Sequence, residues 1–404
     1  RLERSTTTAS IPARSSRCES REPAGPAPMM TTLVEMSPDA TSRVDQIVDK
    51  VVDGDEAPAV IVDCHGHYTT APPQLGAYRD AQRAALDVDP HHVGAKGSIA
   101  ISDDELRESL EPNQLRLQRE RGIDLTLFSP RASWMGHHVG NEHTSRFWTE
   151  HCNELIRRIC DLYPANFAPV CQLPQSPGVG IESSVRELRR CVEEMGFVGC
   201  NLNPDPSGGH WDGPPLFDPA WFPLFETMCE LDVPAMIHVS AACNPHFHST
   251  GSHYLGADTT AFMQALTSGL FRDFPAMRWV IPHGGGAVPY HWGRFKGMAE
   301  GQHTGDGEGW PLVDELMANV YFDTCVYHQP GIDLLVDVIP TTNILFASEM
   351  VGAVKGADPS TGEFYDDTKR YVDRARLTDD QRAMIYSGNV RRVYPRLDLP
   401  TGAA

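Results

Sequence analysis

Eight short apolar runs rich in β-branched residues alternate with longer amphipathic segments along the chain from Ala59 onward. This alternation indicates an α/β fold in which repeated strand and helix units build a parallel sheet. Eight repeats favour a (β/α)8 barrel of the TIM type over an open, doubly wound sheet, and 404 residues suffice for one decorated barrel. The predicted strands are Ala59 to Asp63, Asp124 to Phe128, Phe167 to Leu173, Phe197 to Asn203, Pro234 to Val239, Arg278 to Pro282, Val320 to Asp323 and Ile344 to Ala347.

The segments between these strands predict helices that cover the sheet. Ser102 and Glu105 have the spacing of a capping box, in which two side chains satisfy backbone N–H groups at a helix N-terminus. This motif predicts a helix start after the long excursion that separates the first two strands. Further helices are predicted over Arg146 to Leu162, Ile181 to Met195, Trp221 to Leu231, Thr259 to Ser268 and Gly331 to Val338.

The segment before residue 59 differs in composition from the rest of the chain. It is rich in Arg, Ser, Thr, Ala and Pro and holds almost no large apolar residue before Met29, so residues 1–58 predict a disordered extension. The Arg- and Ser-rich start is similar to a transit peptide, but we interpret it as a mis-assigned start, with Met29, Met30 and Met36 as candidate true starts. A short helix is predicted over Thr41 to Val52, and residues 59–398 are assigned to the barrel.

The charge balance narrows the class of partner. With 54 acidic against 34 basic residues and a net charge of −20, the chain is not expected to bind nucleic acid or an anionic membrane surface. No stretch approaches the roughly 20 apolar residues that a transmembrane helix requires. Ten cysteines without a C-x-x-C pair are typical of reduced thiols in a cytosolic protein. These features favour a cytoplasmic protein whose main partner is neither nucleic acid nor a membrane.

Polar side chains stand at or just past the ends of the predicted strands. In a (β/α)8 barrel the carboxyl ends of the strands meet at one mouth, and that mouth carries the active site. The series contains three strands that end in histidine and a further strand that ends in glutamate, a combination that suits a metal centre. In chain order these residues are His65 and His67, Arg131, Gln172, Asn203, His238, His283, Asp323 and Glu349.

His65 and His67 form the first half of the predicted metal site. Residues i and i+2 of a strand point to the same side of the sheet, so both imidazoles can bind one divalent cation. His238 and Glu349 complete a set of three nitrogen ligands and one oxygen ligand, which suits one Zn²⁺ ion, although Mn²⁺ and Co²⁺ accept overlapping ligands. His283, which opens a run of three glycines, is either a fourth imidazole ligand or, as we prefer, a general acid or base beside the metal.

The histidine pattern resembles that of the metal-dependent amidohydrolase superfamily: H-x-H after strand one, His after strand five, H-G-G-G after strand six and an acid after strand eight. Its amidohydrolase-2 branch includes lyases and decarboxylases such as aminocarboxymuconate semialdehyde decarboxylase. A closer resemblance, over about Val60 to Leu397, is to the 4-oxalomesaconate hydratases of that branch. The segments that carry it are Asp63 to Thr70, Phe128 to Ser133, Asn201 to Pro206, Tyr254 with Ala257 to Thr260, His283 to Tyr290 and Phe346 to Met350.

Two residues depart from the pattern of the hydrolases in that superfamily. Asn203 follows the fourth strand, so no lysine is available there to be carbamylated and to bridge a second metal, and the resemblance implies a single ion. Glu349 follows the eighth strand where aspartate is usual, and this replacement agrees with the hydratases.

The resemblance implies a lyase, a metal-dependent hydratase that adds water across the carbon-carbon double bond of 4-oxalomesaconate. The product would be 4-carboxy-4-hydroxy-2-oxoadipate, formed during the degradation of aromatic compounds such as protocatechuate and gallate. In this conjugate addition, Glu349 would take or hold the proton of the water, and Tyr254 or His283 would deliver a proton to carbon. Dimers are common among the relatives, so a homodimer is expected.

A tricarboxylic oxo acid requires cationic groups for binding, and the planar guanidinium of arginine suits a carboxylate. Arg131 is one candidate, and Arg294 is a second because it matches a substrate-binding arginine of the related decarboxylases. Asn203 and Ser240 are expected to add neutral hydrogen bonds.

Three other functions are compatible with the same motifs. A metal-dependent decarboxylase of an aromatic or muconate-type acid would keep the site and break a different bond. Hydrolysis of an amide or lactone is disfavoured by the expected single metal, and a metal-binding protein without catalysis is disfavoured by the accompanying arginines and proton donors.

Overall fold

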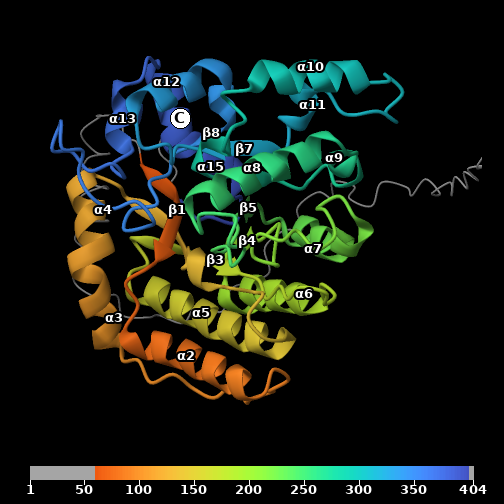
Figure 1. The fold of residues 1–404 in the computed structure, drawn as a ribbon. Coiled ribbons are helices and arrows are strands. Elements are labelled where there is room, and N and C mark those ends of the chain that lie inside the picture. The colour runs from red at the N-terminus through yellow and green to blue at the C-terminus, as the bar shows by residue number, and fades with distance from the viewer. Residues whose placement is uncertain (1–59, 400–404) are drawn as a thin grey trace, which may run out of the picture.

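Eight parallel strands form one sheet in which each strand pairs with the next strand along the chain (Figure 1). The computed structural model describes residues 60–399, so the extension predicted over residues 1–58 and its helix lie outside the described residues. The predicted parallel sheet of eight strands is confirmed. The strands are β1 Val62–Tyr68, β2 Leu125–Pro130, β3 Phe167–Gln172, β4 Gly199–Leu202, β5 Ala235–Ile237, β6 Trp279–Ile281, β7 Val320–Asp323 and β8 Ile344–Leu345.

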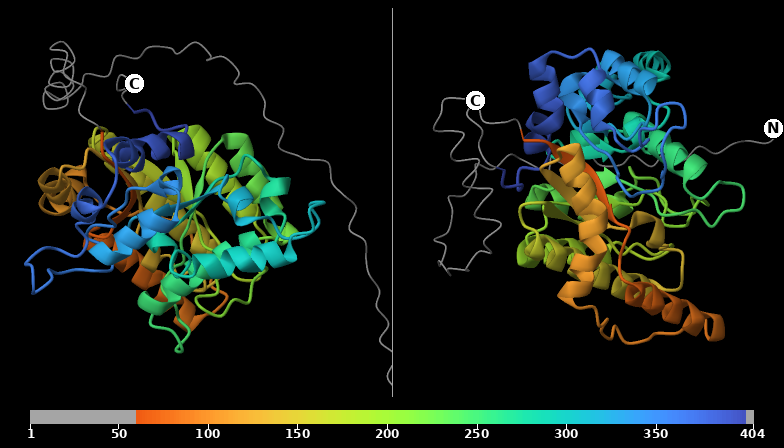
Figure 2. Two further views of the ribbon diagram at one scale, coloured as in Figure 1. Left: turned by 90° about the horizontal axis from the view of Figure 1, so that it is seen from above. Right: turned by 90° about the vertical axis from the view of Figure 1, so that its left-hand side faces the viewer.

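The sheet curls so that the chain after β8 lies beside β1. The backbone N–H of Cys64 donates to the carbonyl of Phe346 at 2.9 Å, and the N–H of Glu349 donates to the carbonyl of His65 at 2.9 Å. Helices surround the curled sheet on its outer face, as the view from above shows (Figure 2, left). The chain after β8 therefore lies along β1, and Glu349 is brought next to His65 at the carboxyl ends of the strands.

The two largest hydrophobic clusters of the described residues lie on opposite faces of the sheet. One lies between the sheet and the surrounding helices and includes the stacked rings of Phe128 and Phe167, whose centroids are 4.4 Å apart. The other lies on the inner face of the sheet and includes Leu127, Val170 and Tyr394. Tyr394 follows the last helix and packs on Gly199, where a Cβ atom would lie 2.8 Å from its ring, so the C-terminal segment covers the starts of the strands. The carboxyl ends of the strands are left for the site.

The first strand extends five residues beyond its predicted end at Asp63, because it pairs with β2 as far as Tyr68. His65 and His67 therefore lie within β1 and not after it. The register shifts between Asp63 and Gly66, and this β-bulge changes which way the following side chains point. Cys64 consequently packs in the inner cluster, while both histidine rings reach the site.

The helices follow the predicted order, with one difference that bears on the site. The Ser102–Glu105 capping box is confirmed at the start of α3, but α8 begins at Gly251, eight residues before its predicted start at Thr259. Glycines at 251 and 256 weaken helix propensity, which hides the first two turns of α8 from sequence patterns. No helix in residues 60–399 is long and apolar enough to cross a membrane.

The helices of the described chain are α2 Pro73–Val88, α3 Asp103–Leu110, α4 Arg116–Arg121, α5 Glu142–Leu162, α6 Glu182–Arg189, α7 Phe222–Leu231, α8 Gly251–Leu266, α9 Leu270–Asp273, α10 Trp292–Gln302, α11 Val313–Leu316, α12 Gln329–Val338, α13 Lys369–Arg374, α14 Asp379–Ala383 and α15 Asn389–Val393.

Candidate metal centre and active site

Three imidazoles converge at the carboxyl ends of the strands. Nε2 of His67 lies 3.0 Å from Nε2 of His65 and 3.2 Å from Nε2 of His238. His65 and His67 come from β1, and His238 follows β5, so two elements far apart in the sequence build the cluster. All three side chains are buried.

Each imidazole is held at its other nitrogen by an acceptor. Nδ1 of His65 lies 2.8 Å from the Asp323 carboxylate, and Nδ1 of His238 lies 2.8 Å from the carbonyl of Val239. A carbonyl or an ionised carboxylate only accepts hydrogen bonds, so both Nδ1 atoms carry protons and both Nε2 atoms present lone pairs. Burial opposes ionisation of Asp323, but its hydrogen bonds to His65 and to the N–H of Gly284, together with the nearby His65 and His283 rings, outweigh burial and lower the pKa of Asp323.

His67 has the same tautomer by a similar argument. Its Nδ1 lies 2.7 Å from the hydroxyl of Ser129, and that hydroxyl donates its own proton to the carbonyl of Gly66 at 3.1 Å. Ser129 must therefore accept a proton from Nδ1 of His67, which leaves the Nε2 lone pair facing the other two histidines.

This arrangement fits a divalent cation. Three converging lone pairs repel one another unless a cation lies between them, and nitrogens bound about 2.05 Å from a tetrahedral Zn²⁺ ion are about 3.3 Å apart, close to the separations observed. Burial lowers the pKa of His67 and of His238 well below the ordinary histidine value, which keeps both rings in the neutral form that binds metals.

Glu349 and His283 lie beside the three imidazoles. Ligand atoms of His65, His238, His283 and Glu349 all lie within 4.8 Å of one another. Oε2 of Glu349 is 3.9 Å from Nε2 of His283 and accepts a 2.8 Å hydrogen bond from the hydroxyl of Tyr327. The carboxylate can therefore contact both a bound cation and a group that transfers protons.

His283 is oriented by an ionised partner on α8. Its Nδ1 lies 2.9 Å from the carboxylate of Asp258. Burial alone would lower the pKa of His283, but the carboxylates of Asp258, Glu349 and Asp323 together outweigh burial and raise that pKa from 6.5 to about 9. Nε2 of His283 and the hydroxyl of Tyr254 are buried and have no hydrogen-bond partner among the described residues, and the two rings are 5.5 Å apart. Both groups are thus available to a substrate.

The glycines after His283 allow a tight turn over the end of β6. Gly284, Gly285 and Gly286 all have positive φ, and a Cβ atom at Gly285 would lie 2.3 Å from the ring of Phe322. The run therefore places His283 by close packing against β7, where a side chain would not fit.

A cavity of about 260 Å³ opens over this cluster. It is wide enough for a small polycarboxylate and combines metal-ligating, proton-transferring and cationic side chains. The residues that line it are His67, Thr69, Arg131, Ala132, Ser133, His238, Thr250, Tyr254, Glu349, Gly352, Ala353 and Lys355.

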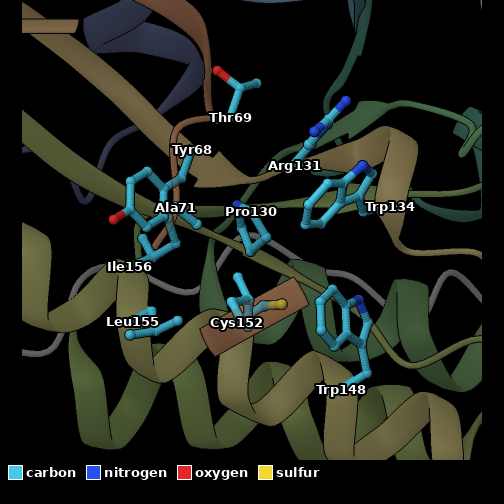
Figure 3. Close-up of a pocket in the computed structure, with 11 residues that line it drawn as sticks. Tyr68, Thr69, Ala71, Pro130, Arg131, Trp134, Trp148, Cys152, Leu155 and Ile156 are labelled. Atoms are coloured by element: carbon cyan, nitrogen blue, oxygen red, sulfur yellow. The ribbon is translucent and has the colours of Figure 1, made fainter. Parts of the chain in front are cut away.

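Arg131 is held at the wall of this cavity by two neighbours. Its Nε donates to the hydroxyl of Ser133 at 2.9 Å, and its guanidinium carbon lies 4.3 Å from the centre of the Trp134 ring. Figure 3 shows the guanidinium next to Trp134 and above an apolar bed that contains Pro130 and Trp148. The gap in this bed, about 10 Å³, is barely the size of one water. The two terminal nitrogens of Arg131 remain for a ligand.

The other predicted substrate residues are placed differently. Asn203 and Ser240 are buried and lie against each other, with Nδ2 of Asn203 3.4 Å from the hydroxyl of Ser240, and neither lines the cavity. Arg294 is exposed on α10 and is likewise absent from the cavity wall. Their roles in binding stay predictions.

Sequence reasoning missed several residues that the fold brings to the site. Asp323 was recognised at the end of its strand, yet its bond to His65 was not foreseen. Tyr327 and Asp258 reach the site through loop and helix geometry that carries no sequence motif, although Asp258 lies within a segment of the family resemblance. Lys355, in the loop after β8, lines the cavity and was likewise not predicted from the sequence.

Comparison with known proteins defines the class. The amidohydrolase family profile matches residues 62–396, and the chain belongs to the amidohydrolase family. Within it, the chain is 58% identical over 340 residues to 2-keto-4-carboxy-3-hexenedioate hydratase of Sphingobium sp., an alignment that covers 84% of this chain and 97% of that protein.

Two further comparisons show that the chain is more similar to a hydratase of the family than to a decarboxylase. The crystal structure of 4-oxalomesaconate hydratase from Rhodopseudomonas palustris matches with a TM-score of 0.75 and 54% identity, covering 83% of this chain and 96% of that one. Gamma-resorcylate decarboxylase of Polaromonas sp. is 30% identical over 203 residues, which cover 46% of this chain and 60% of that enzyme.

Proposed function

We propose that this protein is a metal-dependent hydro-lyase that adds water to 4-oxalomesaconate and forms 4-carboxy-4-hydroxy-2-oxoadipate in the degradation of aromatic compounds. The observation that carries this proposal is the 58% identity that extends over 97% of a hydratase. The similarity to a decarboxylase is weaker and covers 46% of the chain.

The proposal includes a closed (β/α)8 barrel and one bound ion. The two backbone hydrogen bonds between β1 and the chain after β8 support the closure. His65, His67, His238 and Glu349 would hold Zn²⁺, with Mn²⁺ or Co²⁺ as alternatives of similar ligand preference. A bound divalent ion of this kind supplies Lewis acidity, which brings the pKa of a water molecule from its bulk value to about 7.

Glu349 would accept the proton of the attacking water. Its carboxylate lies among the converging imidazoles and lines the cavity, so a water molecule there is within reach of its oxygens. In the substrate form whose double bond is conjugated with the ketone, 2-keto-4-carboxy-3-hexenedioate, the water oxygen bonds to the alkene carbon distant from the ketone, and the electron pair of the double bond moves toward the ketone oxygen.

Tyr254 or His283 would complete the addition by giving a proton to the carbon next to the ketone. Both have a buried polar atom without a partner among the described residues. Burial raises the pKa of Tyr254, and Asp258 raises that of His283, so each holds its proton at neutral pH. The proton that Glu349 gains then returns to the donor through solvent.

Arg131 would bind one substrate carboxylate with its two unoccupied terminal nitrogens. Asn203, Ser240 and Arg294 are further proposed contacts. A homodimer, a cytoplasmic location and a place in protocatechuate or gallate degradation belong to the same proposal.

The assay that tests this function supplies 4-oxalomesaconate to zinc-loaded protein and follows the loss of the conjugated double bond by absorbance. Glu349→Gln and His65→Ala should lower kcat by at least about 1,000-fold, because each removes a group that acts in the reacting centre. Glu308→Gln and His91→Ala are matched controls on exposed loops and should leave kcat unchanged. Activity that survives in Glu349→Gln would contradict the assignment of the base.

A further inference from the structure

The lysines of this chain are few, and one of them differs from the rest. Of five lysines, four lie in the described residues. Three of these form ion pairs: Lys96 with Glu150 and Glu154, Lys296 with Asp314, and Lys369 with Asp373. Within residues 60–399, the side chain of Lys355 has no ion pair or hydrogen bond. This is notable because acidic residues outnumber basic ones 54 to 34 in the full chain.

Lys355 lines the cavity that contains the catalytic cluster. It belongs to the loop between β8 and α13, which lies beside β1 in Figure 1. The hydroxyl of Thr69, just after β1, donates to the carbonyl of Val351 at 2.7 Å and fastens the start of this loop to the mouth. After Lys355, the loop is braced by a hydrogen bond from the N–H of Tyr365 to the carbonyl of Gly356 at 3.2 Å. These bonds hold the loop that carries Lys355 at the entrance of the cavity.

The charges of the cavity wall match a polycarboxylate. Its cationic side chains are Arg131 and Lys355, and its one carboxylate is Glu349. Arg131 offers a planar fork that is fixed by Ser133 and Trp134. Lys355 is exposed, and the hydrated point charge of a lysine suits a carboxylate that must enter and leave with each turnover.

We propose that Lys355 binds one carboxylate of the substrate and thereby contributes to the selection of a tricarboxylate, an inference that rests on the proposed hydratase function. Its ammonium also offsets, at the entrance, the repulsion between a substrate with three negative charges and a protein of net charge −20. Arg131 and Lys355 then contact different carboxylates of one bound molecule.

The test compares Lys355→Gln with the unaltered protein on 4-oxalomesaconate and on three analogues, each with a different carboxylate replaced by a primary amide. On the natural substrate, KM should rise roughly tenfold with kcat nearly unchanged, since the lost contact is a charge-assisted hydrogen bond at an exposed site. For one analogue, and only one, the variant and the unaltered protein should have equal kcat/KM. Lys355→Arg should restore part of the lost affinity.

Lys296→Gln is the matched control, because Lys296 lies on α10 outside the cavity wall. This substitution should leave both kcat and KM unchanged. An unchanged KM in Lys355→Gln, or an equal loss on all three analogues, would overturn the role of Lys355. Failure of the proposed function is a separate result, since the unaltered protein would then leave 4-oxalomesaconate unchanged.

Discussion

The hydroxyl of Tyr327 donates a 2.8 Å hydrogen bond to Oε2 of Glu349, and both residues have left-handed backbones, with φ of 65° and 49°. His283 shares this conformation at φ 52°. Left-handed backbone is costly for residues other than glycine and asparagine, and it gathers at sites where a side chain must be aimed. An unfavourable backbone conformation is thus found at three residues whose side chains meet around the Glu349 carboxylate.

Tyr327→Phe should lower kcat by about tenfold or more and change KM little. The variant keeps the ring and removes the donor, and a hydrogen bond to a charged group contributes about 1.5 to 3 kcal/mol. Steady-state kinetics on 4-oxalomesaconate measures the effect, with Tyr290→Phe as a control because Tyr290 is 76% exposed. An unchanged kcat would show that Tyr327 does not position the carboxylate.

Asp323→Asn should weaken zinc binding by about 10- to 100-fold. The carboxylate holds Nδ1 of His65, and loss of such an outer partner typically costs that much metal affinity. Competition with a chromophoric chelator measures the affinity. Asp337→Asn, which alters an exposed aspartate 3.8 Å from Arg376, provides the control, and equal affinities of all three proteins would contradict the role given to Asp323.

Gly285→Ala should destabilise the protein by about 2 kcal/mol or more. The new Cβ would lie 2.3 Å from the Phe322 ring at a φ of 81°, so both packing and backbone oppose it. Gly297→Ala, in the middle of α10 with no atom within 4 Å of the new Cβ, should be neutral or stabilising by up to about 1 kcal/mol. Denaturant unfolding of the two variants compares them, and similar midpoints would refute the packing argument.

Protonation of His137 should cause part of the loss of folding stability at acidic pH. Burial, with a contribution from Arg79, lowers its pKa from 6.5 to about 3. Between pH 6.5 and pH 3, His137 is therefore protonated in the unfolded chain and neutral in the folded chain. The resulting loss of stability begins as pH falls below 6.5 and reaches about 2 kcal/mol at pH 5.

His137→Gln should therefore lose less stability than the unaltered protein between pH 7 and pH 5. Glutamine can still accept the hydrogen bond that the N–H of Gln175 donates to Nδ1 at 3.3 Å. Urea unfolding at both pH values gives the two differences, and any loss from protonation of the metal ligands is common to both proteins. Equal losses would exclude His137 as a source.

The sequence predicted the architecture better than the details of the site. Strand order and the convergence of His65, His67 and His238 follow from alternation and from the geometry of parallel strands, and both are observed. The predicted end of β1 at Asp63 was wrong, because a bulge and pairing with β2 extend the strand past its apolar run. The family assignment and the hydratase function are supported by the comparisons.

Contacts that depend on tertiary placement were not predictable. The bond between Asp258 and His283 requires α8 to begin at Gly251, where helix propensity is low. Tyr327, which donates to Glu349, has a left-handed backbone that no local residue pattern indicates. The sequence alone therefore predicted the convergence of three histidines, and the residues that orient them required the fold.

The most direct measurement is the mass balance of one turnover experiment, in which zinc-loaded protein receives 4-oxalomesaconate and the product and any released gas are both analysed. The hydratase account predicts a product heavier than the substrate by one water, with no carbon dioxide, and no product from Glu349→Gln. A product lighter by one carbon dioxide would contradict it and assign the same site to decarboxylation.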